Sequence, residues 1–136
     1  GEDTWVDVPF VDGVALIGDA AGYNNPNIGE GLSIALRDVR VLSDVLLTEG
    51  EWSPARLAPY AGERRERLRR LRFSASLMAA IFTRFGPEGA ARRARVLRGV
   101  RDGSCRFGAT LLAVTGDPAL APDWAFTEEY RAEILQ

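Results

Sequence analysis

Residues 13–31 read Gly-Val-Ala-Leu-Ile-Gly-Asp-Ala-Ala-Gly-Tyr-Asn-Asn-Pro-Asn-Ile-Gly-Glu-Gly, and they carry the strongest structural signal in the chain. The apolar run 14–17 lacks alternation, which predicts a short strand covered on both faces. The glycines, asparagines and proline that follow predict a tight loop, and a helical pattern begins near residue 29. The first N–H groups of a helix are unpaired and lie at the positive end of its dipole, so this arrangement predicts a site for an anionic ligand.

The first half of the loop combines small residues with one acid. Gly18 permits a turn or a close approach that a side chain would block. Asp19 offers a carboxylate that accepts hydrogen bonds from vicinal hydroxyls, such as those of a ribose. Ala20 and Ala21 leave room for a ligand to lie against the main chain.

The second half of the loop prepares the start of the helix. Pro26 stiffens the chain because its ring fixes φ. Gly29 and Gly31 leave the first amides of the helix uncovered. The alternative is an ordinary strand-to-helix turn in which Asp19 only caps a helix, but a cap alone requires neither both glycines nor the proline.

Together these residues resemble the Gly-Asp motif of flavin-dependent aromatic hydroxylases and their relatives, a large group of FAD monooxygenases. The resemblance implies that Asp19 binds the ribityl or ribose hydroxyls of FAD. It also implies that the proline loop and the helix start lie beside the flavin ring and the pyrophosphate. No catalytic residue and no metal ligand are predicted in this segment. The predicted cofactor-binding residues are Gly18, Asp19, Ala20, Pro26, Gly29, Glu30, Gly31 and Leu32.

Two residues depart from the pattern of that family. Many members have His directly after the two alanines, where this chain has Gly22. Gln is common between the two glycines, where this chain has Glu30, which adds a negative charge close to the expected edge of the flavin ring. Both departures leave the main-chain chemistry of the motif intact.

The resemblance implies an enzyme that reduces FAD with NAD(P)H and uses O2 to hydroxylate a small organic, often aromatic, substrate. A halogenase or a prenyl-lipid reductase on the same scaffold is an alternative, because residues of a substrate domain would separate these reactions. A non-catalytic binding or scaffold fragment is another.

The length of 136 residues is too short for a complete enzyme of this family. The sequence also lacks an initiator Met and a Gly-x-Gly-x-x-Gly dinucleotide motif. We therefore expect a C-terminal piece of a larger flavoprotein that partners the missing N-terminal part. The expected fold class is α/β: a fragment of an FAD-binding Rossmann-like fold, with two short strands followed by four or five helices, mostly helical. Residues 1–50 would complete the FAD-binding domain, and residues 51–136 would form a helical region packing on it.

The composition is that of a globular protein, with 46% hydrophobic and 26% charged residues. The sequence shows no signal-peptide pattern and no apolar stretch near 20 residues, so we expect a cytoplasmic protein without membrane contact. Cys105 is the single cysteine and His is absent, which excludes an internal disulfide and argues against a zinc site. Cys105 is expected to be a small buried hydrophobe, and the alternative is a thiol whose pKa is lowered by Arg106.

The positive charge is concentrated in residues 63–106, which hold 13 of the 17 arginines and only four acids. Such a block can bind nucleic acid. The block lacks interleaved aromatic residues and a known reading module, so no nucleic-acid partner is expected. We expect the arginines to pair with acidic groups, either in residues 1–62 or in the missing domain.

The remaining patterns predict one strand and several helices. Residues 5–8 alternate as a half-buried strand does, and residues 29–47 form a mostly apolar, buried helix in which Asp38 is a structural hydrogen-bonding group rather than a site residue. Residues 60–85 form one long helix with a mostly apolar stripe that repeats every 3.5 residues. The helix is expected to be solvated over residues 63–72 and buried over residues 73–82. We expect its apolar stripe to pack within the chain, and a homodimer contact is the alternative. The stripe consists of Leu57, Tyr60, Arg64, Leu68, Leu71, Ala75, Met78, Phe82 and Phe85.

Three further elements are predicted at the C-terminal end. Residues 88–101 form a helix with four exposed arginines at positions 92, 93, 95 and 98. Residues 105–114 form a helix, although Gly108 and Thr110 leave a strand open. Thr127 caps a last short helix.

Overall fold

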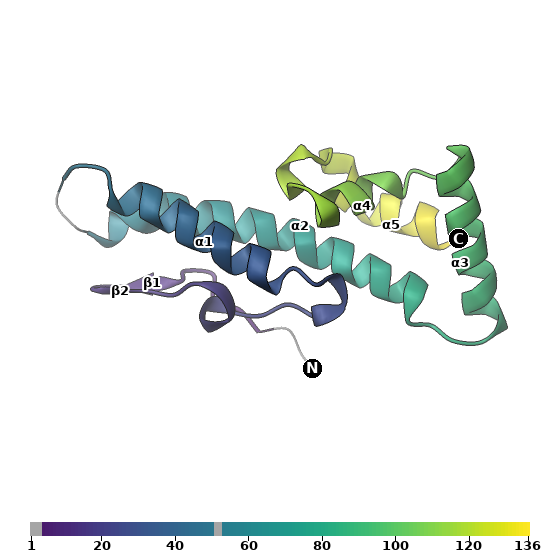
Figure 1. The fold of residues 1–136 in the computed structure, drawn as a ribbon, viewed down its shortest axis with the longest axis horizontal. Helices are drawn as coiled ribbons and strands as arrows, with labels where there is room; N and C mark the ends of the chain where they lie inside the picture. Colours follow the sequence, from purple (N-terminus) through teal and green to yellow (C-terminus); the bar gives the residue numbers. More distant parts are fainter. Residues whose placement is uncertain (1–3, 51–52) are drawn as a thin grey trace. The chain divides into compact units, whose positions relative to one another are not determined.

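The computed structural model describes residues 4–50 and 53–136. Within these ranges the chain forms two short strands and five α-helices, joined by 3₁₀ turns (Figure 1). Contacts divide it into two units, residues 1–68 and 69–136, with the boundary inside helix α2 (Ala58–Phe82). The expected division of the sequence at residue 50 remains a prediction, and Glu51 itself lies outside the described residues.

The strands form a small hairpin at the start of the first unit. β1 (Phe10–Val11) pairs antiparallel with β2 (Val14–Ala15), so that Phe10 lies opposite Ala15. The strand predicted over residues 5–8 is wrong: these residues are exposed, and the N–H of Val6 donates to the carbonyl of Ala21 instead of to a strand. The prediction that residues 14–17 are covered on both faces is also wrong, because Val14 is 49% exposed and residues 15–17 are only half-buried.

Two 3₁₀ turns lead from the hairpin to the first helix. η1 (Gly18–Ala21) contains Asp19, and η2 (Pro26–Ile28) begins with the loop proline. Helix α1 (Gly31–Leu46) then lies within the range predicted for it. It begins two residues later than predicted because Gly29 ends η2 in a left-handed conformation with φ +70°.

The prediction that this helix is buried is wrong for the described part of the chain. α1 packs against η1 and the 3₁₀ turn η3 (Pro54–Leu57), and its buried residues are Ile34 and Asp38. The hairpin is too small to cover the rest of the apolar surface. Exposed apolar side chains on α1 include Leu32, Leu36, Val39 and Leu46.

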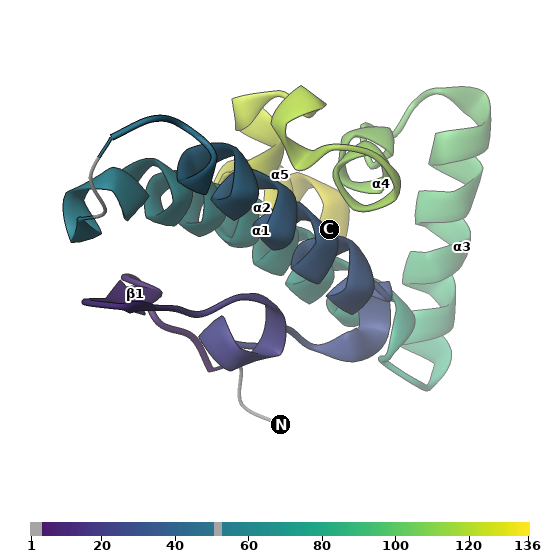
Figure 2. The ribbon, with the colours of Figure 1, turned by 60° about the vertical axis from the view of Figure 1, so that its left-hand side comes forward.

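Helix α2 confirms the long helix expected after residue 60, although it ends at Phe82 rather than at residue 85. In the first unit, α1 and the beginning of α2 run side by side in opposite directions, with the hairpin and η1 on one side of them (Figures 1 and 2). The prediction that residues 63–72 are solvated holds for Arg65, Glu66 and Arg69, which are exposed. It is wrong for Arg64 and Arg67, which are only 2% and 8% exposed. Both are buried because they form ion pairs with Asp38 of α1.

The second unit consists of the remainder of α2 and three further helices, α3 (Pro87–Asp102), α4 (Gly108–Thr115) and α5 (Glu128–Leu135). Residues 108–115 are therefore a helix and not a strand. The side chain of Thr127 accepts a hydrogen bond from the N–H of Tyr130, which confirms the predicted cap. The core of this unit contains Leu77, Ile81, Val96, Phe107, Ala113, Ala121, Ala125, Phe126, Tyr130 and Ile134.

Two of the four arginines predicted to be exposed on α3 are half-buried, Arg92 and Arg93. Arg92 donates to the carbonyl of Leu135, and Arg93 donates to that of Arg84. Helix ends leave carbonyls without intrahelical partners, and a long guanidinium reaches them while its stem packs on the core. Cys105 is half-buried and packs against this core. No helix in the described ranges combines the length and the apolar character needed to cross a bilayer.

Candidate functional site

A hollow of about 440 Å³ lies in the first unit, where the loop after the hairpin meets the start of α1. Five of the predicted cofactor-binding residues line it, and they come from η1, η2 and the first turn of α1. The lining residues are Asp19, Gly22, Tyr23, Asn24, Asn25, Pro26, Ile28, Gly29, Glu30, Gly31 and Ile34.

The other three predicted site residues do not line this hollow. Gly18 is buried, and its N–H donates to the carboxylate of Asp38 at 2.9 Å. Ala20 and Leu32 are exposed beside the hollow. The structure therefore brings Asp19, the proline and the glycines of the helix start together, and it places Gly18 behind them.

The glycines at the helix start leave open space. A Cβ atom placed on Gly29 or on Gly31 would meet no described atom within 4 Å. Gly18 is different, because its φ is +53° and a Cβ there would lie 3.2 Å from the Cβ of Ala35 in α1. Gly18 is thus favoured by its left-handed conformation and by its close contact with α1, whereas the glycines of the helix start border open space.

Gly22 explains one departure from the hydroxylase pattern. Its φ is +115°, and a Cβ at this position would overlap the carbonyl oxygen of Thr4 and the Cα of Trp5. The N-terminal segment runs beside the loop here, held by the hydrogen bond from Val6 to Ala21. The histidine common in that family therefore has no room in this chain.

The three polar residues after Gly22 differ in their surroundings. Asn25 uses its side-chain oxygen to accept a hydrogen bond from the N–H of Asn27 at 3.0 Å, which stabilises η2. Tyr23 is 40% exposed at the rim. The side-chain nitrogen of Asn24 is buried and has no hydrogen-bond partner among the described residues. An unpaired buried donor is unfavourable, so a ligand oxygen at this wall would stabilise it.

The charge in the hollow is negative. Of the described residues that line it, two are acidic, Asp19 and Glu30, and none is an arginine. Glu30 precedes the first turn of α1, and its carbonyl accepts the hydrogen bond of Ile34 at 2.9 Å. Cationic side chains are thus lacking on these walls, and a bound anion would depend on main-chain N–H groups.

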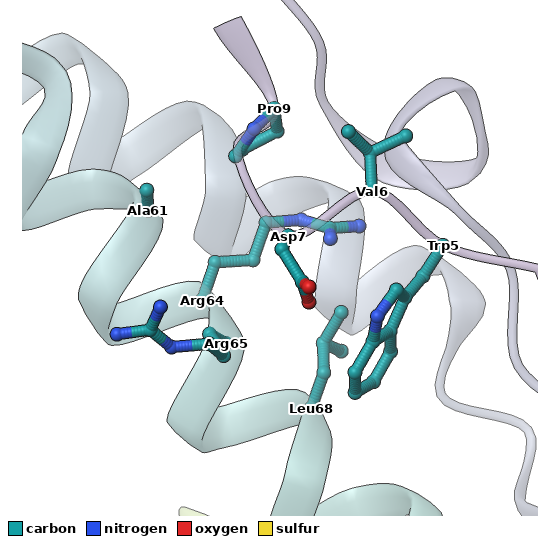
Figure 3. Close-up of a pocket in the computed structure, with 8 residues that line it drawn as sticks. All are labelled: Trp5, Val6, Asp7, Pro9, Ala61, Arg64, Arg65 and Leu68. Carbon is teal, nitrogen blue, oxygen red and sulfur yellow. The ribbon is translucent and has the colours of Figure 1, made fainter.

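A second hollow in the first unit is much smaller, with room for about one water molecule at roughly 10 Å³. The N-terminal segment faces α2 across it (Figure 3). It is too small for an organic ligand, so the hollow beside α1 is the candidate site. The residues around the small one are Trp5, Val6, Asp7, Pro9, Ala61, Arg64, Arg65 and Leu68.

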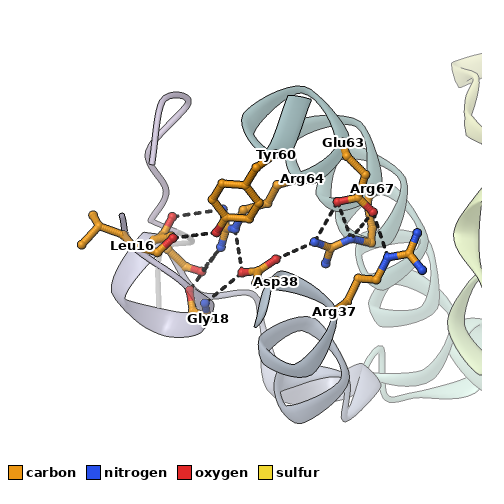
Figure 4. A network of polar contacts seen from close by, with 10 residues as sticks. Leu16, Gly18, Arg37, Asp38, Tyr60, Glu63, Arg64 and Arg67 are labelled. Carbon is orange, nitrogen blue, oxygen red and sulfur yellow. Dashed lines mark hydrogen bonds and ion pairs between the residues drawn. The ribbon is translucent and has the colours of Figure 1, made fainter. Parts of the chain in front are cut away.

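Behind the loop, a buried carboxylate joins the loop to both helices (Figure 4). Asp38 is fully buried, and one of its oxygens, Oδ2, accepts hydrogen bonds from the N–H of Gly18 and from Nε of Arg64, both at 2.9 Å. Its other oxygen, Oδ1, accepts one from Nη2 of Arg67 at 2.5 Å. The prediction that Asp38 is a structural hydrogen-bonding group is confirmed.

The other N–H groups of Arg64 donate hydrogen bonds to the main chain of the loop. Nη2 donates to the carbonyl of Gly18 at 3.1 Å and to that of Gly22 at 3.4 Å. Nη1 donates to the carbonyl of Ala21 at 3.2 Å. One guanidinium therefore satisfies carbonyls at both ends of η1.

Tyr60 holds the segment that connects β2 to the loop. Its hydroxyl donates to the carbonyl of Leu16 at 2.6 Å. Burial, together with the negative charge of Asp38, raises the pKa of Tyr60 to about 12. The hydroxyl is thus a neutral donor throughout the physiological range.

Arg67 continues the network toward the surface. Glu63 accepts hydrogen bonds from Arg67 and from Arg37 of α1, each at 3.1 Å. Burial lowers the pKa of Arg67, but the carboxylates of Glu63 and Asp38 outweigh it, so the pKa is raised. The expected pairing of arginines with acids of residues 1–62 is confirmed for Arg64 and Arg67, which share Asp38.

The role of Arg64 was not predicted, although the sequence holds a signal for it. Arg64 and Tyr60 occupy positions in the apolar stripe of α2. A charged side chain at such a position means either that the apolar face was assigned incorrectly or that the side chain is buried and paired with an opposite charge. Its partner, Asp38, lies 26 residues away in another helix.

Over 59 residues, which are 41% of this chain, the sequence is 48% identical to 3-(3-hydroxy-phenyl)propionate/3-hydroxycinnamic acid hydroxylase 2 of Burkholderia vietnamiensis. The match covers 11% of the length of that protein. No protein-family model matches the chain, and no solved structure matches it. The chain thus shares a segment of sequence with an aromatic-acid hydroxylase.

Proposed function

We propose that this chain supplies part of the flavin-binding site of an FAD-dependent monooxygenase, which hydroxylates a small aromatic substrate with NAD(P)H and O2. The observation that carries the proposal is the hollow of about 440 Å³ that is lined by both Asp19 and the glycines at the start of α1. The similarity to an aromatic-acid hydroxylase supports it independently.

The residues at the hollow fit a polyhydroxylated ligand with a flat ring. The exposed carboxylate of Asp19 would accept hydrogen bonds from ribityl or ribose hydroxyls, and the open surfaces of Gly29 and Gly31 would let a ring approach the main chain. The side-chain nitrogen of Asn24, which has no partner among the described residues, would donate to a ligand oxygen after a small shift.

The charge of the hollow indicates which part of the cofactor it would hold. A diphosphate is bound best by arginine, lysine or a cluster of main-chain N–H groups. The described residues lining this hollow include two acids and no arginine. The two acids would repel a diphosphate more than the N–H groups of the helix start alone would attract it. We therefore place the uncharged ring and its hydroxyl-bearing chain here, and the diphosphate farther from the hollow than the resemblance implies.

When bound, the flavin would supply the redox chemistry of hydride acceptance and oxygen transfer. The contribution of this chain would be to bind and orient. Asp19 would fix the hydroxyl-bearing chain, and the N–H groups at the start of α1 would stabilise negative charge that develops on a neighbouring ring.

Oxygen consumption by the full-length protein tests this function. Supplied with FAD and NAD(P)H, the purified protein should consume O2 faster when 3-hydroxyphenylpropionate or a related phenolic acid is added. The amount of hydroxylated product should rise in proportion to the amount of NAD(P)H oxidised. Dependence on halide would indicate a halogenase on the same scaffold, and reduction of a prenyl lipid without O2 uptake would indicate a reductase. A protein that takes up no flavin would contradict the proposal and favour a scaffold role.

A further inference from the structure

We infer that Asp38 and Arg64 are positioning residues for the proposed flavin site: they fix the main chain of residues 18–22 from behind, so that Asp19 stays on the wall of the hollow. The part of this inference that concerns flavin binding rests on the proposed function. Its structural part, the control of the loop by two buried charges, can be tested without any flavin.

The loop that carries Asp19 is weakly defined by its own sequence. η1 is a four-residue 3₁₀ turn, and its internal support includes the bond from the N–H of Gly22 to the carbonyl of Asp19 at 3.1 Å. It is bounded by Gly18 with φ +53° and Gly22 with φ +115°. Glycine reaches many conformations at little energetic difference, so a turn that begins and ends with glycine needs support from elsewhere.

That support comes from both sides of Gly18. The carboxylate of Asp38 binds its N–H, and the guanidinium of Arg64 binds its carbonyl. The same guanidinium also reaches Ala21 and Gly22, and its Nε binds Asp38. The two side chains are thus tied to each other and to both ends of the turn (Figure 4).

Burial shows why a charged pair is needed at this place. Asp38 is 0% exposed and Arg64 is 2% exposed. Replacing a buried ion pair with apolar residues is often neutral or favourable for stability, so packing of α1 on α2 alone does not require these charges. An apolar pair could not bind the N–H and three carbonyls of a loop, which is what Asp38 and Arg64 do.

Neither side chain lines the hollow that contains Asp19. Loss of the pair would therefore remove no ligand contact, and any change in ligand binding would result from movement of the loop. This separates positioning from direct binding.

Two matched substitutions test the inference in the full-length protein. Arg64→Lys keeps the charge beside Asp38 but lacks the fork that reaches several carbonyls. Arg67→Lys changes an ion pair to the same carboxylate, and the donors of Arg67 go to Asp38 and Glu63 rather than to the loop. The free energy of unfolding of both variants is first measured by chemical denaturation, so that changes in the loop can be separated from changes in global stability.

Amide hydrogen exchange at Gly18 and Gly22, measured by NMR without flavin, is the first readout. We expect exchange to be about tenfold to a hundredfold faster in Arg64→Lys than in Arg67→Lys, the range that corresponds to losing hydrogen bonds from a charged group. Equal exchange in the two variants, after correction for their stability, would overturn the inference. If Arg64→Lys does not fold, Arg64→Gln, a neutral side chain that can still donate to a loop carbonyl, is measured in the same way and judged by the same criterion.

Riboflavin binding, followed by flavin fluorescence, is the second readout. We expect weaker binding in Arg64→Lys than in Arg67→Lys. Faster exchange with unchanged affinity would overturn the positioning role. If the unsubstituted protein binds neither riboflavin nor FAD, the proposed function fails, and the exchange data alone still decide whether the pair holds the loop.

Discussion

The main-chain N–H of Gly18 donates a 2.9 Å hydrogen bond to Asp38, a residue of α1 that lies twenty positions later in the chain. This bond connects the loop before the candidate site to the helix that begins at that site. Arg64 of α2 closes the arrangement by binding both residues. The geometry of the loop therefore depends on residues of both helices.

Removing the charge of Asp38 should destabilise the protein strongly. In Asp38→Asn, two buried guanidiniums, those of Arg64 and Arg67, lose their shared counter-charge, and breaking a buried ion pair from one side costs about 3–5 kcal/mol. Urea unfolding measures this change. Asp44→Asn, at an exposed position of the same helix, should change the free energy of unfolding by no more than about 0.5 kcal/mol. Equal effects of the two substitutions would show that the buried charge has no special role.

Tyr60 should make stability depend on pH in the alkaline range. Its pKa is raised from 10.0 to about 12 in the folded protein, because burial and Asp38 disfavour the phenolate. The unfolded chain therefore releases this proton at lower pH than the folded chain does. The stabilisation is complete below pH 10 and is lost as the pH rises through 12.

Tyr60→Phe should remove this part of the pH dependence. At neutral pH it should also cost about 1–2 kcal/mol, since the carbonyl of Leu16 loses its donor. Unfolding free energies at pH 8, 10 and 11 provide the measurement, with Tyr23→Phe at the exposed rim as the control. The chain has no lysine to obscure the alkaline range. An identical alkaline decline in the parent protein and in Tyr60→Phe would refute this assignment.

Alanine at two loop glycines should separate steric overlap from backbone strain. Both Gly22 and Gly29 have positive φ, which costs another residue about 1–2 kcal/mol. At Gly29 the added methyl group enters open space, whereas at Gly22 it overlaps the main chain of Thr4 and Trp5. Gly22→Ala should therefore lower the melting temperature clearly more than Gly29→Ala. The reverse order would mean that the N-terminal segment does not lie beside the loop.

The helices and the loop could be predicted from the sequence because they depend on local chemistry. The loop proline and Gly29 indicate the turn before α1, although the helix begins at Gly31, two residues later than predicted, and the cap of α5 follows from Thr127. Such features need only neighbouring residues. The same holds for Asp19 and the glycines, which the structure brings to one hollow.

The strand β2 falls within the predicted range 14–17, but its partner β1 and the buried arginines could not be predicted in the same way. Alternation over residues 5–8 indicates a strand only if another strand is available as a partner, and Val6 pairs with the loop instead. Likewise, a run rich in arginine is typical of a solvated surface until a buried acid is known to lie opposite. Arg64 and Arg67 find that acid in Asp38, on a different helix, and only the folded chain shows it.

The affinity of the full-length protein for FAD, measured by fluorescence titration, tests the central claim most directly. Asp19→Ala should weaken binding by about 1–3 kcal/mol, because a charged hydrogen-bond acceptor is lost. Asp12→Ala, at an exposed position in the hairpin turn, should leave the affinity unchanged. If both variants bind FAD as tightly as the parent protein, Asp19 does not contact the cofactor and the hollow beside α1 is not the flavin site.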